Sequence, residues 1–287
     1  MLTALAIACA GTACAQPWLA DIQSLVETEK AFAAASAREG VKRAFLSYLA
    51  EGSVLFRPHP VNGRQVWAAR PDPPFLLSWY PSHAEISSDG RLGFTTGPSV
   101  LTDTSGGGRR DWHGHFVTVW KRGGDTAWKV VLDAGVGHEE ILPPPPMFDP
   151  ARAPRRDSGT VPTGGSSLDT VLARERSCGE IAENSGLLAA YAKYARHDIR
   201  VYREGSTPSL GVPNPDSASG TGGLRGHLEP ISGDIAASKD MAYIYGKFTA
   251  SAEATAPTAY YVRIWTLEWG KDWEIALELW LPVPPPK

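Results

Sequence analysis

The chain contains one sequence pattern twice. In the first copy Phe116-Val-Thr-Val-Trp120 precedes Trp128-Lys-Val-Val-Leu-Asp133, and in the second Tyr261-Val-Arg-Ile-Trp265 precedes Trp273-Glu-Ile-Ala-Leu-Glu278, 145 positions later. Further upstream, six residues match at a separation of 146 positions: Glu29, Gly40, Ala44, Phe45, Tyr48 and Arg57 with Glu175, Gly186, Ala190, Tyr191, Tyr194 and Arg203. The sequence therefore predicts a tandem duplication of one domain of about 125 residues.

Composition limits the class of protein and its partners. The 287 residues are 43% hydrophobic and 21% charged, which is ordinary for a globular chain and sufficient for two cores. The formal net charge is −3, the pI is about 6.2, and the sequence has no long run of Lys or Arg. This charge pattern argues against nucleic acid and against an anionic membrane surface as partners.

The first residues are typical of an export signal. An apolar run too short to span a bilayer, Met1 to Ala10, ends near Ala13-Cys14-Ala15. We expect residues 1–15 to be a signal peptide and the protein to be exported to the periplasm or outside the cell, with no membrane contact after its removal. A minor alternative is a lipoprotein attached at Cys14, although Gly11-Thr12-Ala13 is a poor lipidation motif.

Signal removal would leave Cys178 as the only cysteine, so no disulfide can form within the mature chain. The equivalent position in the first copy is Phe32, 146 residues earlier. Because one copy has Phe where the other has Cys, we expect a buried core position rather than a reactive thiol.

Each copy is predicted to place helices before strands. Apolar residues recur every three or four positions over 18–38, Gly40 interrupts the pattern, and a short second helix starts at Val41. We expect an extended segment over 54–57 and a third short helix over 75–83. Three strands should follow, over 92–96, 113–121 and 128–134. The second copy repeats the order from Leu168.

This order predicts an α+β fold in two tandem cone-shaped domains, each with helices packed on a curved antiparallel sheet. The predicted segments are a first domain over 16–142, a linker rich in Pro and Gly over 143–166, and a second domain over 167–287.

The combination of a helix with a mid-face Glu29, the Gly40 break, a short aromatic helix and the strands ending in Trp120 and Asp133 resembles the nuclear transport factor 2-like superfamily. It is similar in particular to the SnoaL-like and ketosteroid isomerase-like branch. The resemblance implies a cone-shaped fold that encloses an often apolar pocket and often pairs with a second such domain across the sheet. The two copies would then form a pseudo-dimer within the chain. Members include enzymes, binding modules and proteins without known chemistry, so the resemblance does not choose an activity.

A hairpin in which Trp120 pairs with Trp128 would place His115 opposite Asp133. An imidazole beside a carboxylate can act as a general acid or base, so His115 and Asp133 are the candidate catalytic pair. The alternative is a solvated cross-strand ion pair, and a shift of one residue would separate the two side chains. The same register would pair Tyr260 with Glu278 in the second copy.

Two buried ion pairs are also expected. Glu29 and Glu175 fall on the apolar faces of their helices, and a buried carboxylate requires a partner. We expect Arg57 to pair with Glu29 and Arg203 with Glu175, either as structural ion pairs or as polar anchors at the floor of a pocket.

The candidate pocket is lined by a mixed set of residues. It comprises Glu29, Arg57, Trp79, His113, Phe116, Trp120, Trp128 and Leu132, with Glu175, Arg203, Tyr260 and Glu278 as second-domain equivalents. Aromatic residues at such positions are also typical of a core, and periodicity does not identify the strand face that lines the pocket. The histidine spacing matches no zinc motif, and the sequence has neither a phosphate-binding glycine loop nor a Gly-x-Ser-x-Gly elbow, so we expect no metal and no cofactor.

Three functions remain open. The first is an exported protein whose first domain binds a small, largely apolar molecule. The second is a cofactor-independent isomerase, hydratase or cyclase-like enzyme that uses His115 and Asp133. The third is a dimerisation or assembly module without chemistry. Because the second copy has Tyr260 where the first has His115, any chemistry is expected in the first domain.

Overall fold

The computed structural model describes residues 17–103, 105–106, 108–123, 127–153, 167–213, 224–251, 258–268 and 271–284. The predicted signal peptide, residues 1–15, lies outside the described residues, as do residues 154–166 of the predicted linker. None of the described helices is both long enough and apolar enough to cross a membrane.

The first half of the chain forms a sheet with helices on one side. Its elements are α1 (Pro17–Glu39), α2 (Val41–Tyr48), β1 (Leu49–Phe56), β2 (Pro60–Asn62), α3 (Gly63–Ala69), β3 (Phe75–Trp79), β4 (His83–Ile86), β5 (Leu92–Asp103), β6 (Arg110–Arg122), β7 (Trp128–His138) and the short helix η1 (Pro150–Arg152). The strand order is β2-β1-β7-β6-β5-β3, and β4 also pairs with β5.

The second half repeats this plan with fewer elements. It contains α4 (Leu168–Ser185), α5 (Leu187–Tyr194), β8 (Ala195–Arg203), β9 (Ser209–Leu210), β10 (Gly226–Ile235), β11 (Met241–Ala250), β12 (Thr258–Leu267) and β13 (Trp273–Pro282). The strand order is β10-β11-β12-β13-β8-β9. The α+β class and the two domains predicted from the sequence are therefore confirmed.

The sheets are mixed rather than purely antiparallel, which corrects one part of the prediction. β1 runs parallel to β7, and β8 runs parallel to β13. Each of these strands follows the helices directly and joins its sheet beside the last strand of the same half, so it does not continue the meander.

The helical pattern of the first half is confirmed. Ile22, Leu25 and Phe32 on α1 are almost fully buried, as the spacing predicts. Gly40 has a φ of 88° and Gly186 a φ of 93°, a backbone conformation that side chains with a Cβ rarely adopt. Glycine at these two equivalent positions therefore ends the first helix and starts the second in each half.

The predicted helix over 75–83 is wrong, because the chain forms strands there. In β3, Phe75 and Leu77 are half-buried and Trp79 is buried, while the residues between them are exposed. Burial at every second position is the pattern of a strand. The third helix of this half is α3, which begins after Asn62 accepts a hydrogen bond from the Gln65 backbone N–H at 2.9 Å.

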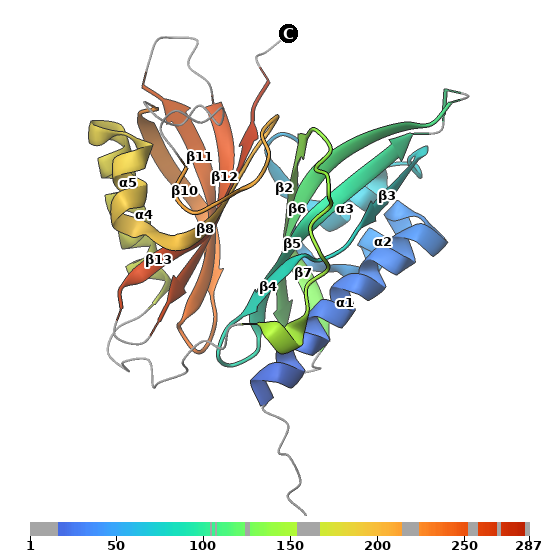
Figure 1. Cartoon of the computed structure of the whole chain (residues 1–287), viewed down its shortest axis with the longest axis horizontal. Coiled ribbons are helices and arrows are strands. Elements are labelled where there is room, and N and C mark those ends of the chain that lie inside the picture. Colours follow the sequence, from blue (N-terminus) through green and yellow to red (C-terminus); the bar gives the residue numbers. More distant parts are fainter. Residues whose placement is uncertain are drawn as a thin grey trace, which may run out of the picture.

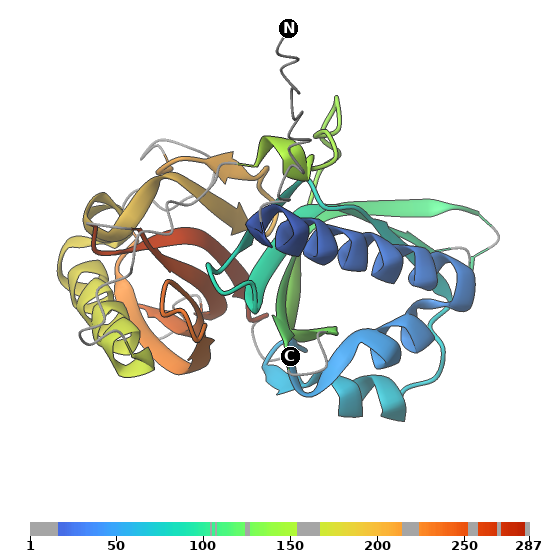
Figure 2. The same ribbon diagram turned by 90° about the horizontal axis from the view of Figure 1, so that it is seen from below.

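The two sheets lie in the middle of the molecule and the helices lie outside them (Figure 1). Seen from below, α1, α2 and α3 lie on the side of the first sheet that faces away from the second domain (Figure 2). One apolar cluster packs between these helices and their sheet, a second lies under α4 and α5, and a third takes residues from both sheets.

Polar contacts also join the two halves. Arg196 on β8 donates two hydrogen bonds to the Glu85 carboxylate on β4, at 2.9 and 3.1 Å. Two turns exchange matching bonds, since the Ser88 N–H donates to Asp240 and the Ser238 N–H donates to Asp89, each at 2.9 Å. The two bonds are reciprocal, since each turn donates one and accepts one.

Candidate functional site

The register of the β6–β7 hairpin separates His115 from Asp133. His115 pairs with Val136 and Thr118 pairs with Asp133, and the register shifts between Val119 and Trp120. The sequence-based pairing assumed an uninterrupted ladder, and the bulge breaks that assumption. The predicted catalytic pair is therefore corrected: His115 and Asp133 lie on opposite faces of the sheet.

The second half has the equivalent bulge, between Ile264 and Trp265. As a result Arg263, not Tyr260, pairs with Glu278, and Tyr260 pairs with Leu281. The predicted Tyr260–Glu278 pair is corrected for the same reason. Since both bulges occur at equivalent positions, Thr118 corresponds to Arg263 and Asp133 corresponds to Glu278.

A cavity of about 280 Å³ lies in the first domain between its helices and sheet. Seven of the lining residues are aromatic: Phe32, Phe45 and Trp67 from the helices, and Phe56, Phe75, Trp79 and Phe116 from the strands. Four polar side chains also face it, namely Arg57, Ser99, Thr118 and Asp133. A volume near 300 Å³ with a mostly apolar lining and few polar groups is characteristic of a small-molecule site.

Asp133 is the carboxylate of this cavity. Its Oδ1 accepts a hydrogen bond from the Thr118 hydroxyl at 2.8 Å. Burial raises its pKa to about 7, the negative charge of Glu29 adds to the increase, and the Thr118 bond and the charge of Arg57 oppose it. At neutral pH this carboxyl can therefore both accept and donate a proton.

Arg57 lies at the edge of the cavity and keeps solvent exposure. Its Nη1 donates to the Phe56 carbonyl at 2.7 Å, which fixes one side of the guanidinium. Desolvation lowers its pKa, and the negative charge of Asp133 opposes that decrease. No carboxylate within the described residues forms a salt bridge with Arg57, so the predicted Glu29–Arg57 pair is wrong.

Glu29 has other partners, all of them neutral donors. Its carboxylate accepts hydrogen bonds from the indole N–H groups of Trp79 and Trp120, at 2.5 and 2.8 Å, and from the hydroxyl of Thr95. Burial raises the pKa of Glu29, and these three bonds oppose the increase. Glu29 itself does not line the cavity, but it holds Trp79, which does.

His115 lies on the side of the sheet that faces the second domain. Its Nδ1 is 2.7 Å from Nε2 of His138, and its ring stacks on Tyr202 with a centroid separation of 5.6 Å. Burial and the neighbouring positive charge of His138 lower its pKa to about 4. His115 is therefore neutral at physiological pH and does not line the cavity.

The remaining predicted pocket residues have different places. His113 lines a second, smaller cavity of about 230 Å³ beside the proline segment. Leu132 belongs to the cluster between the two sheets, because the bulge moves it to that face. Trp120 and Trp128 pack in the core under α1. Of the first-domain candidates, the structure thus places four on the 280 Å³ cavity: Arg57, Trp79, Phe116 and Asp133.

The second domain has a charged network in the corresponding region. Arg263 is completely buried and donates to Glu175 at 2.7 Å and to Glu278 at 2.6 Å. Glu278 also forms a salt bridge with Arg203, and Tyr191 donates its hydroxyl to the same carboxylate. The predicted Glu175–Arg203 pair is therefore wrong. Glu175 pairs with Arg263, and Arg203 pairs with Glu278.

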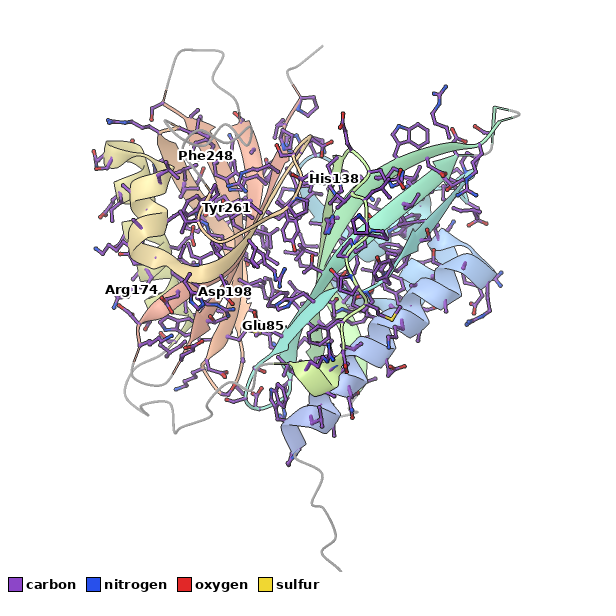
Figure 3. All side chains as sticks on the ribbon, in the orientation of Figure 1. Glu85, His138, Arg174, Asp198, Phe248 and Tyr261 are labelled. Carbon is purple, nitrogen blue, oxygen red and sulfur yellow. The ribbon has the colours of Figure 1, made fainter. Side chains whose placement is uncertain are left out.

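Larger side chains occupy the positions that line the cavity in the first domain. Equivalence follows from the strand pairing, which matches Ser99 with Phe248 because their partners Gly114 and Ala259 are 145 residues apart. The other replacements are Tyr191 for Phe45, Arg263 for Thr118 and Trp280 for Gly135. Phe248 and Trp280 are buried, and their ring centroids are 4.4 Å apart. Figure 3 shows Phe248 and Tyr261 on the strands of the second domain.

Sequence reasoning missed several cavity residues, although the duplication carried a signal for some of them. Ser99, Thr118 and Gly135 are small where the second copy has Phe248, Arg263 and Trp280, and that size difference marks the first copy as the open one. Leu281, which lines the first-domain cavity from the second domain, had no such signal.

Within the described ranges, no three His, Cys, Asp or Glu side chains are close enough to hold a metal ion together. Cys178 is buried beside Arg263, whose Nη1 is 3.3 Å from its sulfur, and burial raises the pKa of the thiol to about 12. Such a thiol is not activated for nucleophilic chemistry.

Comparisons with known proteins concern the fold. No family model and no curated protein matches this chain. The solved structures that resemble it include an NTF2-like protein from Cytophaga hutchinsonii, which is 14% identical with a TM-score of 0.34 and covers 42% of this chain and 100% of its own. NTF2-like and ketosteroid isomerase-like proteins are thus among the solved structures to which this chain is similar.

Two further matches have the same extent. A ketosteroid isomerase-like protein from Erwinia carotovora atroseptica is 8% identical, with a TM-score of 0.31, over 40% of this chain and 94% of its own. A putative Ca/calmodulin-dependent kinase II association domain from Exiguobacterium sibiricum is 11% identical, with a TM-score of 0.32, over 42% of this chain and 94% of its own. Matches this distant say nothing about ligand or reaction.

Proposed function

We propose that the first domain binds a small, mostly apolar molecule in the 280 Å³ cavity, with Asp133 and Arg57 contacting its polar part. The observation that carries this proposal is the difference between the halves, since small residues line the cavity in the first domain and large ones replace them in the second. A protein interior is normally close-packed, so an open volume lined by small residues in the first copy is consistent with use.

The aromatic lining supplies most of the binding free energy in this proposal. Burial of apolar surface is worth roughly 25 cal/mol per Å². The indole N–H of Trp67 is buried and has no hydrogen-bond partner among the described residues, so a polar atom of the ligand can also be accommodated there.

A titration of the full-length protein with the neutral apolar fluorophore 1-aminoanthracene tests the proposal. Binding in the cavity increases its fluorescence. The variant Ser99→Phe introduces the residue that the second domain has at this position, and we expect it to abolish binding while the protein stays folded. Leu76→Phe, on an exposed position of β3, is the matched control and should bind normally. Equal binding by wild type and Ser99→Phe would contradict the proposal.

A second candidate function is proton transfer in the same cavity. The pKa of Asp133, about 7, favours it, because a general acid–base group works best near the operating pH. Such an enzyme would be an isomerase or lyase and would use Asp133 without His115. Exchange of solvent deuterium into a bound ketone, present in wild type and absent in Asp133→Asn, would support this function.

Two proposals concern the setting of the site. The first is export, for which the apolar segment before Gln16 is the support, and N-terminal sequencing of the mature protein in the periplasm or medium would test it. The second is a pseudo-dimer within the chain, supported by the shared apolar cluster and by the hydrogen bond at 2.8 Å between His59 and Tyr260.

A further inference from the structure

Arg57, at the cavity edge, is equivalent to Arg203 of the second domain, which forms a salt bridge with Glu278. Arg57 donates from Nη1 to the carbonyl of Phe56 at 2.7 Å, and Arg203 donates from Nη1 to the carbonyl of Tyr202 at 3.0 Å. Arg57 directly follows β1, and Arg203 is the last residue of β8. The two guanidinium groups are thus held in the same way by the backbone.

The second nitrogen distinguishes them. Nη2 of Arg203 binds the Glu278 carboxylate and the Tyr191 hydroxyl. At the equivalent of Glu278 the first domain has Asp133, which is one methylene shorter and bonds to Thr118 instead. Among the described residues, no carboxylate forms a hydrogen bond or salt bridge with Arg57, which lines the cavity.

The second domain also has an aromatic side chain beside its arginine, at a position where the first domain has glycine. In the second domain the Arg203 guanidinium lies 4.4 Å from the centre of the Trp280 ring. The same position in the first domain is Gly135, which lines the cavity and provides no side chain. The second domain thus fills its own cavity with an indole and a carboxylate that both contact one arginine.

We infer that the ligand of the first domain is an aromatic carboxylate of about the size of an indole, which supplies the ring and the carboxylate that Trp280 and Glu278 supply in the second domain. The ring takes the space beside Gly135 and the carboxylate binds Arg57. This inference rests on the proposed function and names the ligand class for the same cavity. A carboxylate and a guanidinium form charge-assisted hydrogen bonds, which are stronger than neutral ones.

Asp133 does not oppose such a ligand when it is protonated. Its burial in the cavity favours the neutral form, and a neutral carboxyl can donate a hydrogen bond to the incoming carboxylate. The charged groups that act on Asp133 are Glu29, whose charge raises its pKa, and Arg57, whose charge lowers it.

The test is isothermal titration calorimetry of the full-length protein with two matched probes at about pH 6, below the pKa of Asp133. The probes are indole-3-acetate and its neutral isostere indole-3-acetamide. We expect wild type to bind the acetate about tenfold more tightly than the acetamide, the factor typical of a hydrogen bond to a charged group. Arg57→Met should remove this preference without changing the affinity for the acetamide, and Arg57→Lys should keep part of it.

Arg43→Met is the control, because Arg43 is an exposed arginine on α2 outside the cavity lining, and it should retain the full preference. Equal affinity of wild type for the two probes would overturn the inference, as would an equal loss of both affinities in Arg57→Met. Absence of acetate binding would overturn it as well. In that case a titration with 1-aminoanthracene distinguishes the failure of this inference from the failure of the proposed function. If the fluorophore binds, only the ligand class is wrong, and if it does not bind, the proposed function fails too.

Discussion

The two domains share one fold and differ in what fills the space between helices and sheet. Both have the Gly break, the bulge and the backbone-anchored arginine at equivalent positions. The first domain leaves a cavity of about 280 Å³, and the second fills the equivalent space with Phe248, Trp280 and Arg263. The lining positions thus differ in side-chain size between the two halves while the fold stays the same.

The difference also concerns charge. Glu278 lies between Arg203 and Arg263, which lower its pKa and keep it ionised although burial opposes this. Among the described residues Asp133 forms no salt bridge, the charge of Arg57 only partly offsets burial, and its pKa rises to about 7. Burial alone favours the neutral carboxyl, and paired cations restore the charge, so equivalent carboxylates have opposite protonation behaviour.

The largest expected effect comes from removing the second-domain carboxylate. Glu278→Ala leaves Arg203 and Arg263 buried without their shared partner, and we expect it to lower the free energy of unfolding by about 3–5 kcal/mol. The equivalent change Asp133→Ala should lower it by less than about 1 kcal/mol, because no buried cation loses a partner. Urea unfolding of the two variants measures the difference, and equal losses would contradict the assignment of roles.

Exchange of the lining residues should separate packing from binding. Phe248→Ala opens a space beside Trp280 and should cost about 3 kcal/mol of unfolding free energy. Ser99→Phe fills an existing space and should cost less than about 1.5 kcal/mol while it abolishes 1-aminoanthracene binding. If Ser99→Phe proved as destabilising as Phe248→Ala, the first-domain space would already be packed.

The protonation of Asp133 predicts a pH effect of known sign. The unfolded pKa is about 3.9 and the folded pKa is about 7, so the folded state binds the proton more tightly. Stability should therefore fall as pH rises through the window from about 4 to 7 and stay lowered above it. Asp133→Asn should remove this decline. At about pH 8 the variant should therefore have a free energy of unfolding about 1 kcal/mol higher than wild type, a value already reduced because solvent in the cavity screens the charge. No difference between pH 5 and 8 in urea unfolding would contradict the raised pKa.

The smallest effect concerns the residue that the second domain contributes to the first-domain cavity. Leu281→Ala removes apolar surface from the lining, and we expect roughly fivefold weaker 1-aminoanthracene binding, or about 1 kcal/mol. Leu210→Ala, on an exposed position of the second domain, is the control and should leave binding unchanged. Unchanged binding in Leu281→Ala would limit the site to the first domain.

Much of the fold followed from local patterns in the sequence, and the site followed less well. The stripe on α1, the Gly40 break and the strands around Trp120 are local features, and the structure contains them. The His115–Asp133 pair failed because one bulge residue, which no periodicity reveals, moves every following side chain to the other face. The Glu29–Arg57 pair failed because a buried carboxylate can take neutral donors, here Trp79 and Trp120, instead of a cation.

The most direct measurement is a crystal structure of the full-length protein soaked with 1-aminoanthracene. We expect one fluorophore per chain, in the first-domain cavity beside Asp133 and Trp79, and none between α4 and the second sheet, where Phe248 and Trp280 lie. A fluorophore bound in both domains, or in neither, would contradict the proposal that the first domain binds a ligand in its cavity and that large side chains fill the equivalent space of the second.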